Sequence, residues 1–342
     1  MNSNWQDHLI NAGAVYENQQ VIHYGHPEQE RLAAASQTVL CDLSHLGLIA
    51  ASGEESQAFL QGQLTNDLRK INPGQAQYNS YCSPKGRMLA NFMLWQSDGD
   101  YFMQLSPDLQ ESIQKRLSMF VMRSKVKLRD ARGEWVRLGI AGPDAEALVQ
   151  EIVGTLPQGA MAATRSDQAS AIRLQQNRFE LIVALEHAPA LWDSLRSRST
   201  PVGVQVWQWL EIESGIPTLT TATQEHFVPQ MVNFEAIGGV SFQKGCYPGQ
   251  EIVARTQYLG KLKRRMYLAH LSADTTPSAG DELFSSDMEE QSSGMIVNAE
   301  ASPEGGYDLL AVIQMSSVEA GAIHWKSLDG PQLQLRPLPY TV

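Results

Sequence analysis

Apolar and polar positions follow one plan in two separate segments, residues 46–60 and 138–154. Each begins with a short apolar strand, continues through a turn and ends in a helical period. In the first segment Ser52 is a candidate helix cap, with a glutamate three residues later. In the second, Pro143 opens the predicted helix and Gly154 ends it. The repeat predicts two α+β modules of similar construction, each ferredoxin-like.

The pattern between and after these segments completes the predicted fold. Strands are predicted at residues 77–83, 87–95 and 99–105, with a helix at 107–121. Beyond residue 262 only short apolar runs separated by turn sequences remain, at residues 264–271, 281–286, 293–299, 307–314, 321–327 and 332–337. Evenly spaced short strands are typical of a small β-barrel or sandwich. We therefore expect an α+β protein with three domains: a first α+β module (1–135), a second (136–260) and a C-terminal β-barrel (261–342).

Charge is distributed unevenly along the chain. The 342 residues carry a net charge of −11, which argues against a protein that binds nucleic acid or membranes over its whole surface. The segment from Lys244 to Arg265 holds six basic residues and one acid, a local net of +5 that leaves −16 elsewhere. This basic segment is either a solvated strand edge kept soluble by its lysines or a site for a small anion or a restricted stretch of nucleic acid.

Cysteine is sparse. Cys41, Cys82 and Cys246 lie far apart, and none belongs to a CxxC pair, which favours a reducing cytoplasm over a disulfide framework. Because iron–sulfur clusters usually need four protein ligands, we do not expect this chain to hold one alone, and we expect no metal site. The first residues lack the basic start and apolar core of a secretion signal, and no apolar run reaches the ~20 residues of a membrane span.

The octapeptide KGCYPGQE, residues 244–251, is the strongest candidate for chemistry. It places Cys246 between Lys244 and a Pro248-Gly249 turn, directly before a predicted helix. A nearby cation, a helix N-terminus and free backbone N–H groups all favour a thiolate. We therefore predict Cys246 as a functional thiol with Lys244 as its catalytic partner. The alternative is a turn that contains a buried, inert cysteine.

This octapeptide, with the preceding stretch FVPQMVNFEAIGGVSFQ (residues 227–243), resembles the signature of the YgfZ family. The resemblance covers most of the chain and is strongest from Trp207 to Gly260. It implies a cytoplasmic folate-binding protein that supports the assembly or repair of iron–sulfur clusters and thereby tRNA modification. Tetrahydrofolate or a derivative would be the cofactor, and the partners would be iron–sulfur client enzymes, including tRNA-modifying enzymes.

The resemblance also implies where folate binds. Trp207 stands where the family has a folate-contacting tryptophan, and in a strand Trp207 and Trp209 would face the same side. The family's other such tryptophan is replaced by Leu46. A folate site needs a carboxylate or amide for the pterin and cations for the glutamate tail, which suggests Glu213 and Asn233 for the first and Arg255 for the second. The candidate cofactor-binding residues are thus Leu46, Trp207, Glu213, Asn233, Tyr247, Gln250, Glu251 and Arg255.

A wider resemblance links QGQLTNDLRKINPGQAQYNSYCSPKGRMLANFML, residues 61–94, to the aminomethyltransferase of the glycine cleavage system, the T-protein. It implies that the two α+β modules are T-protein-like. Asn91 stands where that enzyme has its catalytic aspartate. An amide has no useful basicity near neutral pH, so we do not expect this enzyme's usual aminomethyl transfer.

Three functions remain open from the sequence. The first is the folate-binding accessory protein that the resemblance implies. The second is a folate-dependent one-carbon transferase, for aminomethyl or methyl groups, with Cys246 as nucleophile. The third is a tRNA-binding module that uses the basic segment from Lys244 to Arg265. No other enzyme signature is present in the chain.

Overall fold

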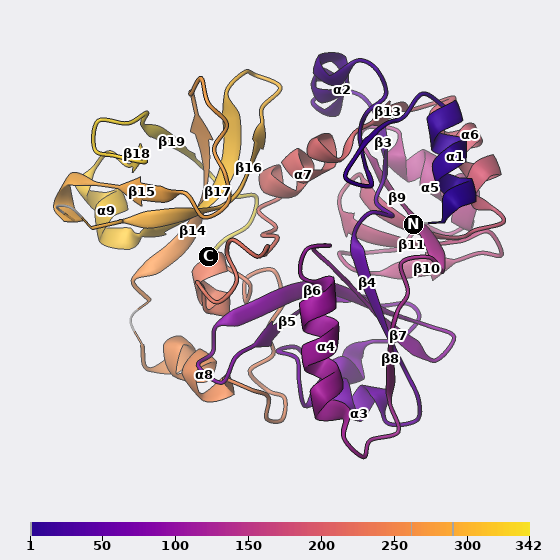
Figure 1. The fold of residues 1–342 in the computed structure, drawn as a ribbon, viewed down its shortest axis with the longest axis horizontal. Coiled ribbons are helices and arrows are strands. Elements are labelled where there is room, and N and C mark those ends of the chain that lie inside the picture. Colours follow the sequence, from indigo (N-terminus) through magenta and orange to yellow (C-terminus); the bar gives the residue numbers. More distant parts are fainter. Residues whose placement is uncertain (1, 261, 289–290) are drawn as a thin grey trace. The chain divides into compact units, whose positions relative to one another are not determined.

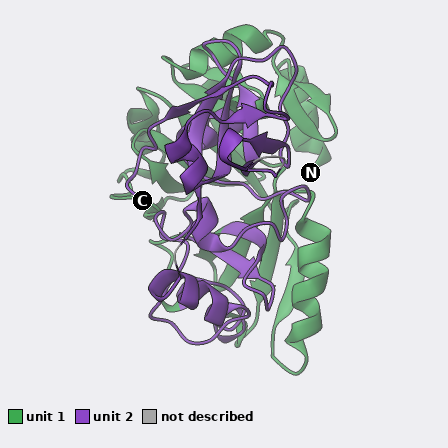
Figure 2. Cartoon of the chain, turned by 90° about the vertical axis from the view of Figure 1, so that its left-hand side faces the viewer, with its two compact units in different colours: residues 1–56, 69–77, 93–207 green, residues 57–68, 78–92, 208–342 purple. Residues whose placement is uncertain are grey.

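The computed structural model describes residues 2–260, 262–288 and 291–342, which form two compact units (Figures 1 and 2). Unit 1, green in Figure 2, comprises residues 1–56, 69–77 and 93–207. Unit 2, purple, comprises residues 57–68, 78–92 and 208–342. Each unit thus draws on three stretches of chain. The expected α+β class is confirmed, while the division into three domains and the ferredoxin-like description of the modules stay predictions.

Unit 1 holds most of the helices. Its elements are α1 (Ser3–Asn11), β1 (Val15–Glu17), β2 (Gln20–His23), α2 (Pro27–Ala34), β3 (Val39–Asp42), β4 (Gly47–Ser52), β7 (Asp100–Leu105), α4 (Gln110–Val121), β8 (Lys127–Asp130), β9 (Trp135–Ala141), α5 (Ala145–Val153), β10 (Ala163–Arg165), β11 (Ala169–Gln175), β12 (Arg178–Ala184), α6 (Ala188–Arg196) and β13 (Thr200–Val202). Five further elements cross a unit boundary: α3 (Ser56–Gln61), η1 (Leu68–Lys70), β5 (Gln77–Cys82), β6 (Met88–Ser97) and α7 (Val204–Glu213).

A six-stranded sheet organises unit 1, in the order β10-β11-β12-β9-β3-β13. Along β12 the apolar residues Phe179, Leu181 and Val183 belong to one core with residues of α1, α5 and α6, which lie beside this sheet in Figure 1. Because side chains alternate along a strand, Arg178 and Glu180 point to the opposite face. One face of the sheet therefore packs against helices, and the other carries buried charge.

Unit 2 ends in a curled six-stranded half-barrel in the order β18-β15-β16-β17-β14-β19. Residues His324 and Gln332 form a bridge that connects β18 with the start of β19. Apolar side chains of all six strands, including Leu283, Ile296 and Leu309, fill its core. Its elements are β14 (Arg264–Leu271), β15 (Glu282–Phe284), η3 (Ser286–Met288), β16 (Gly294–Ala301), β17 (Tyr307–Gln314), α9 (Met315–Ala320), β18 (His324–Trp325) and β19 (Leu333–Arg336), preceded by η2 (Pro229–Val232) and α8 (Gln250–Tyr258). All six strands predicted after residue 262 are confirmed.

Two local predictions are wrong, and one helix was missed. Trp207 and Trp209 lie in helix α7 rather than in a strand, so they point in different directions. The helix is apolar around much of its circumference, which hides the 3.6-residue period. Ser52 is the last residue of β4 and caps no helix, since α3 begins at Ser56. The short helix α9 was not predicted.

Candidate functional site

The segment from Lys244 to Glu251 forms a turn followed by the first residues of α8. Lys244 is 7% exposed. Its Nζ donates hydrogen bonds to the carbonyl oxygens of Gln61 (2.6 Å), Leu64 (2.5 Å) and Asn66 (3.0 Å). The ammonium also lies over the ring of Tyr247, 5.2 Å from its centroid. These contacts fix the beginning of the motif to a part of the chain about 180 residues away in sequence.

The Pro248-Gly249 turn fixes the other end of the motif. Gly249 has φ of +79° and precedes α8. A Cβ at this position would lie 2.4 Å from the carbonyl oxygen of Ser83 and 2.6 Å from Cα of Gly86, both in the turn between β5 and β6. Two backbone segments therefore meet where only glycine fits. The prediction that a helix begins directly after this turn is confirmed, because α8 starts at Gln250.

The three cysteines have different environments. Cys41 and Cys82 are buried, whereas Cys246 is exposed. Burial raises the pKa of the Cys82 thiol to about 12, so this group stays protonated at neutral pH. Cys246 lies between the buried side chains of Lys244 and Tyr247 in sequence. It is the one cysteine of this chain that a reagent in solution reaches directly.

The remaining candidate residues of this segment follow Cys246 in the chain. Burial, together with the neighbouring Cys82 thiol, raises the pKa of Tyr247. Gln250, Glu251 and Arg255 belong to α8, and of these Glu251 and Arg255 are exposed. The backbone carbonyl of Val253 accepts a hydrogen bond from Gln230 at 2.7 Å, which fixes α8 to η2. Predicted cofactor-binding residues on α8 thus lie on a supported helix.

Glu213 and Asn233, the residues suggested for the pterin, also belong to unit 2. Asn233 is fully buried, donates to the carbonyl of Met266 (2.9 Å) and accepts from Arg265 (3.2 Å), so its amide serves the fold. Glu213 is half-buried, and its Oε1 is a buried oxygen without a hydrogen-bond partner in the described chain. Burial, and then the charge of Asp308, raises the pKa of Glu213. Glu213 is therefore the better placed of the two to accept a hydrogen bond from a ligand.

Trp207 and Leu46 belong to unit 1. The Trp207 indole is 4% exposed and lies against Gly139, where an added Cβ would be 2.5 Å from the ring. The guanidinium of Arg178 lies over the same ring, 5.3 Å from its centroid. Glu180 pairs with Gly139 across the strands, so its side chain leaves the sheet on the side of this indole. An aromatic ring, a carboxylate and a guanidinium thus meet on one sheet face.

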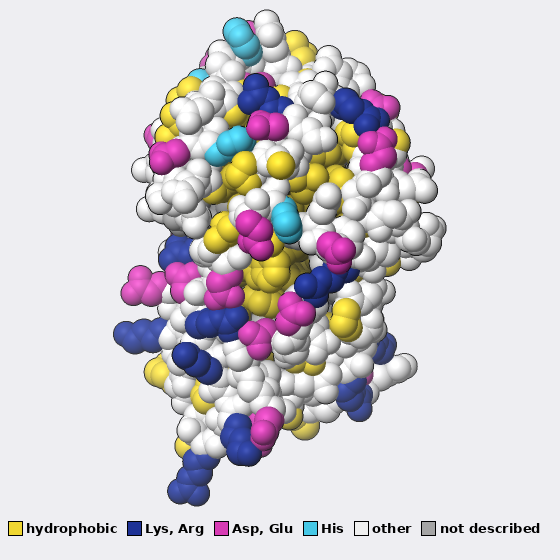
Figure 3. All heavy atoms as spheres, turned by 90° about the vertical axis from the view of Figure 1, so that its right-hand side faces the viewer, with side chains coloured by type: hydrophobic (Ala, Val, Ile, Leu, Met, Phe, Trp, Pro, Cys, Tyr) yellow, Lys and Arg dark blue, Asp and Glu magenta, His cyan; other side chains and the backbone are white. Residues whose placement is uncertain are grey.

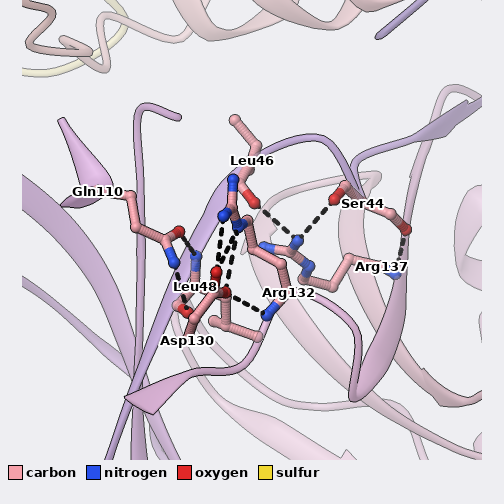
Figure 4. A network of polar contacts seen from close by, with 7 residues as sticks. All are labelled: Ser44, Leu46, Leu48, Gln110, Asp130, Arg132 and Arg137. Carbon is pink, nitrogen blue, oxygen red and sulfur yellow. Dashed lines mark hydrogen bonds and ion pairs between the residues drawn. The ribbon is translucent and has the colours of Figure 1, made fainter. Parts of the chain in front are cut away.

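A buried polar network on this face was not predicted, and Figure 4 shows the part in which Arg137 meets Ser44 and Leu46. Arg137 is fully buried and donates to the carbonyls of Ser44 (3.0 Å) and Leu46 (2.8 Å). It also donates to Gln104 (3.0 Å), which in turn donates to Glu180 (2.9 Å). Burial lowers the pKa of Arg137 to about 10, and the nearby carboxylates oppose this effect. The signal in the sequence was one charged residue inside each apolar strand, in WVRLGIA and in RFELIVA.

Comparison with known proteins places this geometry in a family. Residues 9–241 match the model of the GCVT N-terminal domain. The tRNA-modifying protein YgfZ of Klebsiella pneumoniae is 30% identical over 318 residues, which cover 92% of this chain and 97% of that protein. The YgfZ of Escherichia coli is 31% identical over 319 residues with the same coverage. The chain belongs to the YgfZ family.

The fold of this YgfZ family member is shared with an enzyme. The glycine cleavage system aminomethyltransferase T from Bartonella henselae superimposes with a TM-score of 0.77, covering 98% of this chain and 96% of that one. Only 18% of the residues are identical, so the comparison concerns the fold alone. It confirms the related fold that the sequence suggested.

Asn91, which the sequence suggested as the replacement for a catalytic aspartate, has a structural role here. Its Nδ2 donates to the carbonyl of Pro217 (2.8 Å), and its Oδ1 accepts from the N–H of Leu219 (2.9 Å). The amide thus joins β6 to residues 217–219 with one donor and one acceptor. A carboxylate would lack the donor.

Much of the basic segment is occupied within the fold. Lys244 is bound by carbonyls, and Arg265 forms an ion pair with Glu235. Arg264 contacts the carbonyl of Ser292, while Lys261 lies outside the described residues. Elsewhere, on the face drawn in Figure 3, basic side chains lie among acidic and uncharged ones. Fewer cations of the basic segment are therefore available to bind a large polyanion such as tRNA than the sequence suggested.

Neither a membrane-spanning helix nor a cluster of metal-binding side chains occurs among the described residues. In the described part of the chain, no helix combines the length and hydrophobicity that crossing a bilayer requires. The same residues contain no group of three or more His, Cys, Asp or Glu side chains arranged to hold a metal ion.

Proposed function

We propose that this chain is a folate-binding accessory protein that supports the assembly or repair of iron–sulfur clusters, and thereby tRNA modification, in the cytoplasm. The observation that carries the proposal is the exposed Cys246 on a turn fixed at both ends, whereas Cys41 and Cys82 are buried. A thiol fixed in this way can meet a group on a partner without a large ordering cost. Membership of the YgfZ family, whose named relatives modify tRNA, supports the same reading.

Folate is the cofactor of this proposal, and tetrahydrofolate is its expected form. The match to the GCVT N-terminal domain supports it. On the sheet face of unit 1, the buried Trp207 ring and Glu180 carboxylate are the groups that would stack on a pterin and bind its amide edge. Unit 2, taken by itself, offers the Glu213 carboxylate, with an oxygen that has no hydrogen-bond partner in the described chain, and Arg255, an exposed cation suited to the glutamate tail. Leu46, Tyr247, Gln250 and Glu251 are further candidate contacts.

The test is a cluster-dependent assay in cells that lack this protein. Activity of an iron–sulfur enzyme that modifies tRNA is measured after adding back wild type, Cys246→Ala or Cys82→Ala. We expect Cys246→Ala to lose the activity while its thermal stability stays near wild type, because the thiol is exposed. Cys82→Ala removes a buried thiol and should retain activity in proportion to the folded protein. Full activity of Cys246→Ala would remove the thiol from the mechanism.

A folate-dependent one-carbon transferase is the second candidate, and the accessibility of Cys246 as a nucleophile favours it. Incubation with methylene-tetrahydrofolate and an acceptor, without any iron–sulfur enzyme, separates the two. Turnover that requires Cys246 would support the transferase.

A tRNA-binding module is the weakest alternative because the basic segment is largely occupied. Its test is a tRNA titration at two salt concentrations.

A further inference from the structure

Lys244 occupies a site made of backbone oxygens. An ammonium has three N–H donors, and the carbonyls of Gln61, Leu64 and Asn66 accept one hydrogen bond each. Gln61 is the last residue of α3, where helix carbonyls lack intrahelical partners and a cation is favoured. We name these three carbonyls the carbonyl cage. Since each donor already has an acceptor, the ammonium has no hydrogen left for a reactant.

The carbonyl cage belongs to a fixed part of unit 2. The N–H of Thr65 donates to the carbonyl of Ser80 (3.0 Å), and the N–H of Asn66 donates to the side chain of Asn79 (3.0 Å), both on β5. The cage is therefore held by β5 as well as by Lys244. It offers a stable point to which a loop can be attached.

The same segment also binds the chain that leads into the motif. Thr65 donates through its hydroxyl to the carbonyl of Gly239 (2.7 Å), and Asn66 donates to that of Gly238 (2.6 Å). The N–H of Ser241 donates to the carbonyl of Thr65 (3.0 Å). Lys244 is the last contact in this series before Cys246. Without it, the chain before the thiol is held only as far as residue 241, and the next fixed point is the buried Tyr247 after the thiol.

We propose that Lys244 is a positioning residue that holds Cys246 in place by filling the carbonyl cage, and not a group that exchanges protons with a reactant or ionises the thiol. The inference gives a mechanism to the proposed role of Cys246 and rests on it. The side chain acts by hydrogen bonding to backbone, so its charge matters because three carbonyl oxygens need three N–H donors. An ammonium supplied from solution can therefore replace it.

The experiment uses the full chain with Lys244→Ala, and Lys244→Met as a second variant that keeps an unbranched side chain without N–H donors. Amide hydrogen exchange is followed at residues 243–249, and alkylation of Cys246 by iodoacetamide is followed against pH. Each is repeated with n-propylammonium or with tetramethylammonium, a cation of equal charge without N–H donors. Lys263→Ala, which removes an exposed cation from the same basic segment, is the control.

We expect Lys244→Ala and Lys244→Met to speed amide exchange at residues 243–249 by about tenfold or more, as for lost hydrogen bonds from a charged group. In Lys244→Ala, n-propylammonium restores protection and tetramethylammonium does not, while the pH midpoint of alkylation stays at its wild-type value. Lys263→Ala behaves as wild type. Wild-type protection in both Lys244 variants, equal rescue by both cations, or a shifted midpoint would overturn the inference. None of these readings depends on folate or cluster activity, so they stand apart from the test of the proposed function.

Discussion

Each unit contains a buried cation that is held by backbone carbonyls, and the two serve different ends. Arg137 of unit 1 binds the carbonyls of Ser44 and Leu46 on a sheet face, and Lys244 of unit 2 binds the carbonyl cage beside a loop. Both join a turn to residues far away in sequence. Arg137 also bonds to Gln104, which bonds to Glu180, so it belongs to a larger buried network. Lys244 lies two residues before Cys246, whose thiol is exposed.

The difference shows that similar cation–carbonyl contacts can stabilise a whole core in one unit and hold only a loop with an exposed thiol in the other. In a buried network each hydrogen bond supports the next one. Removing one member therefore destabilises the whole core. A single buried cation at the start of a loop restricts only that loop and leaves the tip open to solvent. The comparison therefore predicts large, global effects for changes at Arg137 and smaller, local ones in the motif.

The largest effect is expected for Arg137→Met. The change leaves the carbonyls of Ser44 and Leu46 and the side chain of Gln104 without their donor, and it removes a buried positive charge near Glu180. We expect a loss of about 3–5 kcal/mol in the free energy of unfolding, the range for breaking a buried ionic network. Urea denaturation of the full chain, followed by tryptophan fluorescence, measures it. A loss below about 1 kcal/mol would contradict the comparison.

An intermediate effect is expected for Gly249→Ala. The added Cβ would meet the carbonyl oxygen of Ser83 at 2.4 Å, and φ of +79° is unfavourable for alanine. We expect a loss of about 1–3 kcal/mol. Hydrogen exchange should locate it at residues 83–86 and 246–253, with the sheet of unit 1 unchanged. Gly133→Ala, at a glycine with open space around its Cβ position, is the matched control.

The smallest effect is expected for Glu300→Gln and depends on pH. Burial raises the pKa of Glu300 to about 8, so the folded chain binds a proton that the unfolded chain has lost. Stability contributed by the neutral acid is therefore present below the ordinary pKa of 4.5 and is lost as pH rises toward 8. We expect Glu300→Gln to match wild type at pH 5 and to melt a few degrees higher at pH 8. If wild type and Glu300→Gln had the same melting temperature at pH 8 as well as at pH 5, Glu300 would be solvated and the prediction would be wrong.

The sequence predicted the half-barrel and the motif turn because their signals are local. The alternation of apolar residues, the glycines and the Pro248-Gly249 pair each determine the backbone conformation of the segment in which they occur. It failed at α7, where apolar residues on several sides conceal the helical period. It did not reveal the partners of Arg137 or Lys244, because carbonyls at residues 44–46 and 61–66 carry no mark in the sequence. Spatial proximity of distant backbone is known only from the fold.

The most direct test of the proposed function is a tetrahydrofolate titration followed by tryptophan fluorescence. Wild type is compared with Trp207→Phe and with Trp209→Phe, whose indole donates to Asp308 at 2.8 Å in unit 2. We expect saturable quenching in wild type and in Trp209→Phe, and loss of most of the signal in Trp207→Phe. Absence of saturable quenching in wild type, with no binding by calorimetry, would contradict the assignment of this chain as a folate-binding protein.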